Sequence, residues 1–393
     1  MMKSAFKHLP AATVAAAIWL GAAGTGLADV KIGATVSVTG PAASLGIPYK
    51  NTLELLPKEI AGEKIDWIIL DDGSDPTTAV KNVKKLISEY NVDAIVGANT
   101  SPIGVANIDV VAEGKTPFLV QAATARMVLP MDDKRYWVFK QSQADSMMVH
   151  AIVAHMKKSG VKSVAFMGFN DAFGDSFWDE FQKAAQEAGL KVVASERYSR
   201  TDTSVTGQVL KIVSAKPDAV FIAAVGTPAA LPAAALRDRG YQGKQYQTHA
   251  VLNADFLRVG GKAVEGTILA AGPMLVAEQL PDSDPVKAVA LNYVRTYEEK
   301  YGAGSRAGFG GHAYDAYALL AAALPKALKV AKPGTPEFRQ ALRDAIESSK
   351  NVPGVHGVFN ITPADHVGLD NRARVIVQVK DGSWKLIDLL ATD

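Results

Sequence analysis

Two hydroxyl side chains follow apolar runs that are predicted to be neighbouring strands of a parallel sheet. Ser101 comes shortly after the run at residues 93–97, and Thr124 comes shortly after the run at residues 117–120. Ligands of open α/β sheets lie beyond the carboxyl ends of the strands, where helix N-termini present free N–H groups. The two segments therefore predict a neutral clamp for a carboxylate, in which each charge-assisted hydrogen bond contributes roughly 1.5–3 kcal/mol. The alternative is that both hydroxyls only cap the helices that follow.

Motifs of hydrolytic enzymes and of metal sites are absent from the sequence. There is no Gly-x-Ser-x-Gly elbow, and His150 and His155 lack the i, i+4 spacing that places two imidazoles on one helix face. The seven histidines are scattered and there is no cysteine, so neither a metal site nor a cofactor is expected. Asp71 and Asp72 end a predicted strand. They could serve acid–base chemistry or bind a divalent ion, but capping of the next turn is the preferred interpretation.

Two glycine-rich stretches, at residues 302–305 and 308–311, are predicted to be loops. They follow a predicted helix rather than a strand, and they lack the Lys-Ser/Thr pair of a phosphate-binding loop. A nucleotide site is therefore not expected at either stretch.

The elements that must position the clamp alternate between short apolar runs and amphipathic stretches of helical length, which predicts parallel sheets flanked by helices. The first block is expected to contain strands at 30–38, 65–70, 93–97 and 117–120 and helices at 47–60, 76–90 and 103–113. The second block is expected to contain helices at 145–158, 175–188, 204–214 and 228–239 and strands at 163–168, 191–197 and 219–224. Longer helices at 285–301, 313–329 and 336–348 precede a hairpin of strands 374–380 and 384–389, joined by Asp381-Gly382 in a tight primed turn. Two Rossmann-like α/β lobes are the simplest account of this order.

The first 28 residues have the three parts of a signal peptide. Lys3 and Lys7 precede an apolar stretch at 11–20, and small residues end at Ala28, where cleavage is predicted. The apolar stretch is too short for a stable membrane span, which needs about 20 residues. We therefore expect an exported, soluble protein, and the absence of cysteine excludes disulfides and a lipid anchor on an N-terminal cysteine.

The composition is that of a globular protein of about two domains. Of the 393 residues, 48% are hydrophobic and 21% are charged, and the formal net charge is +2. A charge this small argues against nucleic acid as a partner.

Seven short segments, in register along the whole mature chain, are similar to the leucine/isoleucine/valine-binding proteins of bacterial ABC importers. They are VSVTGP at 36–41, DDGSDP at 71–76, VG at 96–97 with Ser101, AAT at 122–124, DAFG at 171–174, RDRGY at 237–241 and AYDA at 313–316. Each segment alone is weak, but their common order identifies the chain as a member of this family.

The resemblance implies a type I periplasmic binding fold, in which two lobes close over a ligand by hinge motion. Three hinge crossings between the lobes are expected near Ser142, Gly272 and Gly357. The implied division is residues 29–142 plus 273–356 in one lobe and residues 143–272 plus 357–393 in the other.

The resemblance also implies which residues bind the ligand. Ser101, Ala122 and Thr124 match the carboxylate-binding positions of the family, and Phe173 matches an aromatic position of the second lobe. Other positions depart from the family pattern. Two positions that usually hold aromatic residues are occupied here by Leu45 and by Val225 or Gly226. The acid that normally pairs with the ligand's ammonium group is also missing, because its position falls near His249 and Ala250.

The missing acid indicates a ligand without an ammonium group. Micromolar binding corresponds to about −8.2 kcal/mol, and a buried charge without its partner costs several kcal/mol of this. We therefore expect a small apolar carboxylate, an amino acid or, favoured, an aromatic acid, with His249 donating to a polar ring substituent or bonded only to backbone. Asp202 or Asp255 could still supply the acid if the alignment is shifted.

The expected role is that of a periplasmic, monomeric solute-binding protein that delivers its small-molecule carboxylate to an ABC permease in the inner membrane. The alternatives are a periplasmic sensor that signals to a membrane receptor and, less in keeping with the motifs, an exported α/β enzyme.

Overall fold

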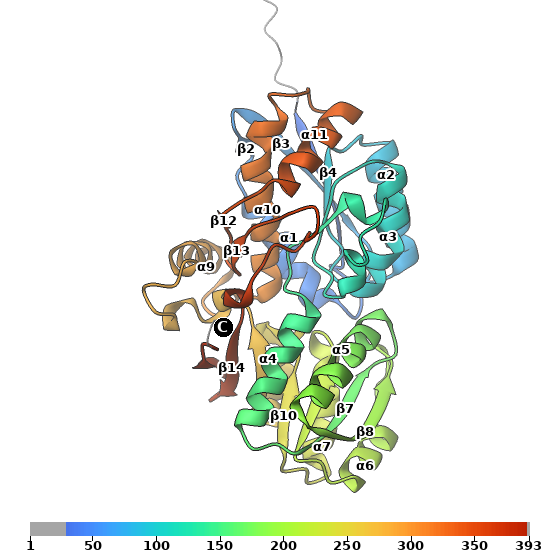
Figure 1. Ribbon diagram of the computed structural model, residues 1–393, viewed down its shortest axis with the longest axis vertical. Coiled ribbons are helices and arrows are strands. Elements are labelled where there is room, and N and C mark those ends of the chain that lie inside the picture. The colour runs from blue at the N-terminus through green and yellow to red at the C-terminus, as the bar shows by residue number, and fades with distance from the viewer. Residues whose placement is uncertain (1–28, 391–393) are drawn as a thin grey trace, which may run out of the picture.

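The computed structural model describes residues 29–390 and shows two α/β lobes that lie one above the other in Figure 1. The predicted signal peptide, residues 1–28, lies outside the described residues. Each lobe contains one mainly parallel sheet with helices on both faces, so the α/β class and the two Rossmann-like lobes are confirmed. Within residues 29–390, no helix is both long and apolar enough to cross a membrane.

The first lobe, at the top of Figure 1, contains a six-stranded sheet of order β2-β3-β1-β4-β5-β6. Its strands are β1 (Val30–Val36), β2 (Glu59–Ile60), β3 (Glu63–Asp71), β4 (Ala94–Gly97), β5 (Phe118–Val120) and β6 (Val138–Lys140). All neighbouring strands are parallel except β2 and β3, which are antiparallel. The helices of this lobe are α1 (Ala43–Leu55), α2 (Pro76–Ser88), α3 (Ser101–Glu113), α9 (Lys287–Tyr301), α10 (Gly308–Ala327) and α11 (Pro336–Glu347).

Side chains of the first sheet alternate between two cores because successive residues of a strand point to opposite faces. Ile95 of β4 packs with α2 and α3, whereas its neighbours Ala94 and Val96 pack with α1 and α10. Both faces are therefore covered by helices, which explains why the strands are continuous apolar runs.

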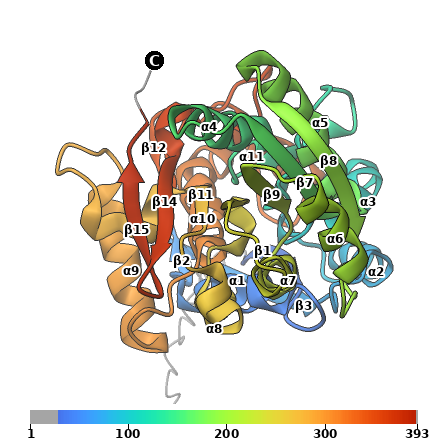
Figure 2. The ribbon, with the colours of Figure 1, turned by 90° about the horizontal axis from the view of Figure 1, so that it is seen from below.

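The second lobe contains a seven-stranded sheet of order β15-β14-β11-β10-β9-β7-β8. Its strands are β7 (Ser163–Phe169), β8 (Lys191–Tyr198), β9 (Ala219–Ala223), β10 (Lys244–Gln247), β11 (Ile268–Ala271), β14 (Val375–Lys380) and β15 (Ser383–Asp388). The helices are α4 (Asp145–Lys158), α5 (Ala172–Ala188), α6 (Thr206–Ser214), α7 (Ala230–Asp238) and α8 (Ala254–Gly260). The two last strands are antiparallel and form one edge of the sheet, as the view from below in Figure 2 shows.

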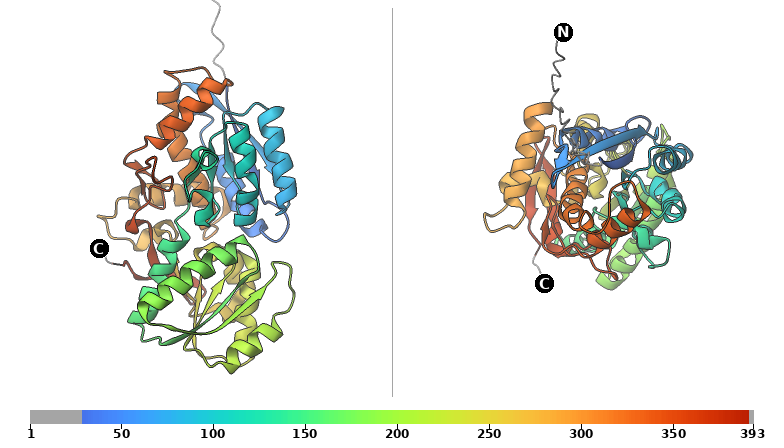
Figure 3. Two further views of the ribbon diagram at one scale, coloured as in Figure 1. Left: turned by 45° about the vertical axis from the view of Figure 1, so that its right-hand side comes forward. Right: turned by 90° about the horizontal axis from the view of Figure 1, so that it is seen from above.

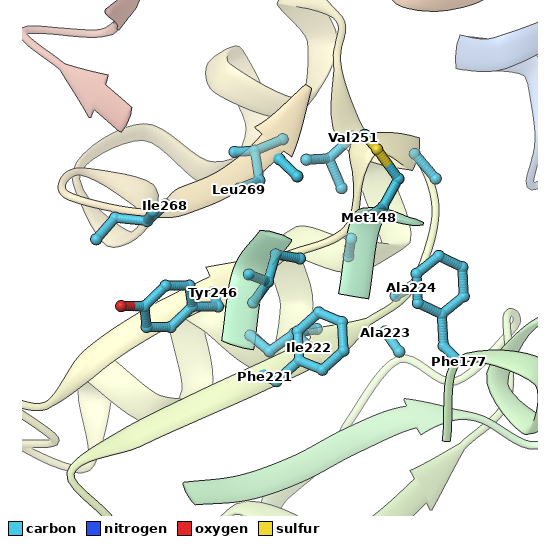
Figure 4. Packing of buried hydrophobic residues seen from close by; sticks show 14 of the residues in the cluster. Met148, Phe177, Phe221, Ile222, Ala223, Ala224, Tyr246, Val251, Ile268 and Leu269 are labelled. Carbon is cyan, nitrogen blue, oxygen red and sulfur yellow. The ribbon is translucent and has the colours of Figure 1, made fainter. Parts of the chain in front are cut away.

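The core of the second lobe is a single cluster of apolar side chains on both sides of its sheet. Figure 4 shows part of it, with Phe221 and Ile222 of β9 beside Phe177 of α5 and Met148 of α4. The ring centroids of Phe177 and Phe221 are 6.3 Å apart. Phe177 thus joins the sheet to the first turns of α5, which carry Phe173 toward the other lobe.

The chain changes lobes three times, between β6 and α4, after β11 and before β14, and these connections lie side by side in Figure 3. Ser142 and Gly272 lie in the first two connections. In the third, Phe359 and Ala373 still pack in the core of the first lobe, and Val375 is the first residue in the core of the second. The packing therefore changes lobes later than the predicted crossing at Gly357.

The prediction of one helix at residues 47–60 is wrong. The helix is α1 (Ala43–Leu55), and a separate strand, β2, follows. Leu56 is extended, with φ −64° and ψ 151°, because the ring of Pro57 disfavours helical backbone in the preceding residue.

The prediction of a loop at residues 308–311 is also wrong, because these residues form the first turn of α10. A β-carbon on Gly310 would collide with the hydroxyl of Tyr293, and one on Gly311 would collide with the ring of His356. The glycines therefore let the start of α10 pack closely against its neighbours. By contrast, Asp381 and Gly382, with φ of 52° and 66°, confirm the predicted primed turn.

Candidate functional site

A nearly closed cavity, with only about 10 Å³ open to a water-sized molecule, lies between the two lobes, at the carboxyl ends of both sheets. From the first lobe it is lined by Leu45, Asn99, Thr100, Ser101, Gln121, Ala123, Ser142, Phe309 and His312. From the second lobe it is lined by Phe173, Val225, His249 and Ala250. The structure thus brings together six of the nine predicted site residues, and it places Ala122, Thr124 and Gly226 behind this lining.

Ser101 is the first residue of α3, four residues after the end of β4. The helix has 13 residues, and Thr100, its N-cap, makes no side-chain hydrogen bond to the first turn. The N–H groups at a helix start have no partner within the helix, and they attract anions together with the helix dipole. Ser101 and the start of α3 therefore make this part of the cavity wall favourable for an anion.

Thr124 is engaged in contacts between the lobes. Its hydroxyl donates to Ser176 Oγ at 2.9 Å, and Ser176 donates in turn to Asp145. Asp145 also accepts from the backbone N–H of Ala125 at 3.3 Å. We call these four residues the Thr124 latch. The Thr124 hydroxyl also accepts from the N–H of Arg126 at 3.3 Å, which is the capping role named as the alternative.

Ala122 is buried beside the cavity rather than exposed to it. A β-carbon on Gly104 would lie 2.9 Å from its methyl group, so Ala122 packs against α3. Its carbonyl oxygen accepts from Ser142 Oγ at 3.3 Å. Ala122 therefore holds the wall of the cavity from behind, next to the first crossing.

Three turns position the second-lobe wall. The carboxylate of Asp171 accepts from the N–H of Phe173 at 2.9 Å and caps α5, which fixes Phe173 at the helix start. The hydroxyl of Thr248 donates to the carbonyl of Ala224 at 2.8 Å and ties the loop after β10 to the loop after β9. His249 and Ala250 follow directly in a short 3₁₀ turn.

Gly226 lets the second lobe approach the first. Its backbone, at φ 58° and ψ −149°, is in a region that is essentially restricted to glycine. A β-carbon there would lie 2.7 Å from Leu45 Cδ1 and 2.5 Å from Ser44 Oγ. Gly226 is therefore placed where the lobes touch, although it does not line the cavity.

Several lining residues were missed by reasoning from the sequence. Asn99, Thr100, Gln121 and Ala123 belong to the strand-end segments that predicted the clamp, so their neighbourhood was the available signal. Phe309 and His312 had no such signal, because the glycine run before them was interpreted as a loop. Ser142 was predicted only to lie near a crossing between the lobes, not to line the cavity.

Buried nitrogens without partners line the cavity. Within the described residues, Gln121 Nε2, His249 Nδ1 and His312 Nδ1 have no hydrogen-bond partner. Leaving a buried donor unsatisfied costs roughly 1–3 kcal/mol. A bound ligand with polar groups would recover this free energy.

One buried lysine lies near the cavity and acts on its lining residue His249. Lys140 is fully buried, and its Nζ donates to the carbonyls of Ser142 at 2.9 Å and Gln143 at 2.5 Å. Burial lowers the pKa of Lys140 to about 8, so the side chain is mainly protonated at neutral pH. Burial, with smaller effects of Lys140 and His356, lowers the pKa of His249 to about 3. Burial also holds the pKa of His312 well below its ordinary value.

Acidic side chains are absent from the cavity lining within residues 29–390. The two acids that might have replaced the family's carboxylate lie elsewhere. Asp255 pairs with Arg258 at 2.8 Å, and Asp202 accepts from the N–H of Ser199 at 2.8 Å. Asp71 and Asp72 likewise accept from the loop residues that follow β1 and β3, as the capping interpretation predicted.

The expectation that the histidines are too scattered to form a cluster is wrong at one place. His312, Asp315 and His356 lie together, with ligand atoms within 4.8 Å of one another. His356 Nδ1 is 2.8 Å from Asp315 Oδ2, and the rings of His312 and His356 stack with centroids 4.1 Å apart at 24°. Lone pairs of imidazole lie in the ring plane, so those of stacked rings run nearly parallel instead of converging on one ion. The cluster is a hydrogen-bonded stack behind the cavity.

A model of the periplasmic binding protein family matches residues 29–383. The chain belongs to the periplasmic binding protein family. This family consists of solute-binding proteins rather than enzymes, and its members bind small molecules and work with ABC transporters.

Individual relatives of this periplasmic binding protein support the same family assignment. Leu/Ile/Val-binding protein BraC3 of Rhizobium johnstonii is 26% identical over 352 residues, which cover 84% of this chain and 86% of that protein. An extracellular ligand-binding receptor from Rhodopseudomonas palustris HaA2 is 46% identical, with a TM-score of 0.89 over 92% of this chain and 100% of that chain. The predicted family and the type I fold are thereby confirmed.

Two more distant structures share the fold and contain ligands. A solute-binding protein of an ABC transporter from R. palustris BisB5 was solved with 3,4-dihydroxybenzoic acid, at 22% identity and a TM-score of 0.77 over 93% of this chain and 98% of that chain. Another from R. palustris was solved with benzoate, at 21% identity and a TM-score of 0.79 over 92% and 96%.

Proposed function

We propose that this periplasmic binding protein captures a small apolar monocarboxylate, preferably an aromatic acid, and delivers it as a monomer to an ABC permease in the inner membrane. The observation that carries the proposal is the cavity wall, which contains the open start of α3 at Ser101 and no acidic side chain among the described residues that line it, with buried Lys140 close enough to act on the lining residue His249. Export to the periplasm would follow cleavage after Ala28.

The electrostatics of the cavity select against an α-amino acid. An ammonium group would lose its hydration without gaining a carboxylate partner, and it would lie near the positive charge of Lys140. Such an uncompensated buried charge costs several kcal/mol. A carboxylate meets the opposite situation, because the α3 N–H groups and Lys140 both favour an anion.

The apolar part of the cavity suits a ring. Phe173 and Phe309 line it from opposite lobes, together with Leu45 and Val225. Aromatic side chains stabilise a bound ring through stacked or edge-to-face packing. The complexes of fold relatives with benzoate and dihydroxybenzoate support this ligand class, and the free Nδ1 of His249 would bind a polar ring substituent.

The three connections between the lobes would act as the hinge. Opening would separate Leu45 from Gly226 and expose the cavity, and closure would bury the ligand between both walls. Hinge closure around a ligand is an established motion for proteins of this shape.

A thermal-shift series tests the proposal, because a ligand that binds only the folded state raises the melting temperature. Benzoate and hydroxylated benzoates are expected to raise it by several degrees at millimolar concentration, and leucine and valine by less. A shift with leucine or valine but none with any aromatic acid would refute the preference for aromatic acids.

The variant Ser101→Ala removes one wall donor and is expected to weaken benzoate binding about 10-fold or more. Ser204→Ala is a matched control, because Ser204 lies in an exposed turn of the second lobe. Equal binding by wild type and Ser101→Ala would show that the start of α3 does not hold the carboxylate.

A further inference from the structure

Three neighbouring strand ends of the first lobe are joined by a chain of buried amides. Ser37 follows β1, Asn99 follows β4 and Gln121 follows β5, and these strands are adjacent in the sheet. The N–H of Ser37 donates to Asn99 Oδ1 at 2.9 Å, and Asn99 Nδ2 donates to Gln121 Oε1. Gln121 Nε2 ends the chain, buried and without a partner among the described residues, in the lining of the cavity.

The direction of this chain follows from its first member. The oxygen and nitrogen of a side-chain amide have nearly the same shape, so their assignment rests on the partners. A backbone N–H can only donate, so Asn99 must turn its oxygen to Ser37 and its nitrogen to Gln121. Gln121 must then accept with its oxygen, which leaves its NH₂ group toward the cavity. Ser37 and Asn99 together make Gln121 a donor that cannot turn around without breaking one of these two bonds.

Gln121 Nε2 donates to no group within the described residues. The other unpartnered nitrogens of the lining, His249 Nδ1 and His312 Nδ1, form no bond with it, and Ser101 lines the same cavity. An unpartnered buried donor calls for an explanation, such as a water, an ion or a ligand that binds it. The partner that fits is an acceptor on the ligand, next to the start of α3.

We propose that Gln121 is a ligand-binding residue that donates its side-chain N–H to the ligand's carboxylate, with Ser37 and Asn99 fixing it as a donor. This inference rests on the proposed function, because it requires a carboxylate in the cavity. Gln121 takes the place that the sequence had assigned to Thr124, whose hydroxyl is occupied by Ser176. Asn99 is a positioning residue, since it acts on the ligand through Gln121.

The direct test is calorimetric titration of Gln121→Met with benzoate. If another carboxylate of the thermal-shift series binds more tightly, that acid and its primary amide are used instead of benzoate and benzamide. The variant keeps the length of the side chain and removes the donor, and the dissociation constant is expected to rise about 10- to 100-fold. Gln245→Met is the matched control, because Gln245 is also fully buried but lies on β10, away from the cavity lining.

The orientation of the amide chain is tested by Asn99→Asp. A carboxylate at this position can only accept, so Gln121 would turn its NH₂ group toward it and its oxygen toward the cavity. The ratio of benzoate to benzamide affinity should then fall about 10-fold or more, because the amide ligand can donate to that oxygen. Because the new charge alone disfavours benzoate, the reference is the double variant Asn99→Asp with Gln121→Met, which carries the same charge. A benzoate-to-benzamide ratio that is no lower in Asn99→Asp than in this double variant would refute the orientation.

The outcomes separate this inference from the proposed function. If wild type binds benzoate and Ser101→Ala weakens it, but Gln121→Met binds within about twofold of wild type, the role of Gln121 is refuted and the function stands. If wild type binds no carboxylate at all, both are refuted. Circular dichroism and the melting temperature without ligand show that each variant is folded.

Discussion

The two walls of the cavity are built differently. The first-lobe wall carries most of the polar groups, with Asn99, Ser101 and Gln121 after the ends of parallel strands, beside the apolar side chains of Leu45 and Phe309. The second-lobe wall is mainly apolar, with Phe173 and Val225, and His249 is its one lining side chain with a free polar atom among the described residues. The difference suggests a division of work, in which the first lobe recognises the carboxylate and the second lobe closes over the apolar remainder. Substitutions on the two walls should therefore change ligand affinity and ligand preference in different ways.

Blocking closure should have the largest effect. Gly226→Ala places a β-carbon against Leu45 and Ser44 of the other lobe, and overpacking of this kind together with backbone strain costs a few kcal/mol. We expect benzoate affinity to fall about 100-fold, and small-angle scattering with benzoate should show a larger radius of gyration than for wild type. Gly207→Ala is the control, since a β-carbon at Gly207 meets open space. Wild-type affinity for Gly226→Ala would show that the lobes need not meet at this point.

Changing the apolar wall should alter the choice of ligand. Phe173→Leu keeps an apolar surface but removes the ring, and it is expected to weaken benzoate about 3- to 10-fold. The aliphatic acid 4-methylpentanoate should lose less than about 2-fold, because it makes no ring contact. Competition titrations with both acids measure the difference. An equal loss of affinity for both acids would mean that Phe173 only fills space. The second-lobe wall would then not select for a ring.

A smaller effect is expected from pH. An anion near Lys140 favours its protonated form, so the bound protein holds the proton more tightly than the free protein. Because the pKa of Lys140 is about 8 in the free protein, benzoate affinity should be constant from about pH 5 to 7 and fall about fourfold by pH 8.5. The groups that act on Lys140 are Asp145 and Asp365.

The same lysine has the opposite effect on folding stability. Its pKa is lower in the folded protein than in the unfolded chain, so the unfolded chain binds more protons between about pH 8 and 10.5, and the contribution of Lys140 to stability rises with pH there. Lys140→Met should remove both trends, as titration calorimetry and melting curves at each pH would show. An unchanged pH profile in Lys140→Met would assign the dependence to another group.

Much of the fold could be predicted from the sequence because most strands are continuous apolar runs. The seven strands predicted in the two blocks match β1, β3, β4, β5, β7, β8 and β9 to within two residues, whereas β2, β6, β10 and β11 were not predicted. Strand β10 was missed because two of its four residues are Gln245 and Gln247, which are buried but polar and give no apolar run. Strand β6 is three residues long and ends in Lys140, so it lacks both the length and the pattern of a strand.

The candidate site was predictable only as far as it follows strand ends. Ser101 and His249 lie within four residues of the ends of β4 and β10, and they line the cavity. His312 belongs to a helix about 190 residues further along the chain than Gln121, and only the packing of α10 brings the two to one cavity. The direction of the amide in Gln121 depends on Ser37 and Asn99, and no local sequence pattern encodes such a chain of partners.

The Thr124 latch has a consequence for how affinity and selectivity are divided. Its hydrogen bonds join the lobes outside the cavity lining, so they form on closure whichever ligand is enclosed. Their free energy offsets part of the cost of closing and adds the same increment to the affinity of every ligand. Weakening the latch would therefore lower all affinities in proportion and leave the ranking of ligands unchanged. Affinity and specificity can thus vary independently in this protein, the first through residues at the lobe contact and the second through the cavity walls.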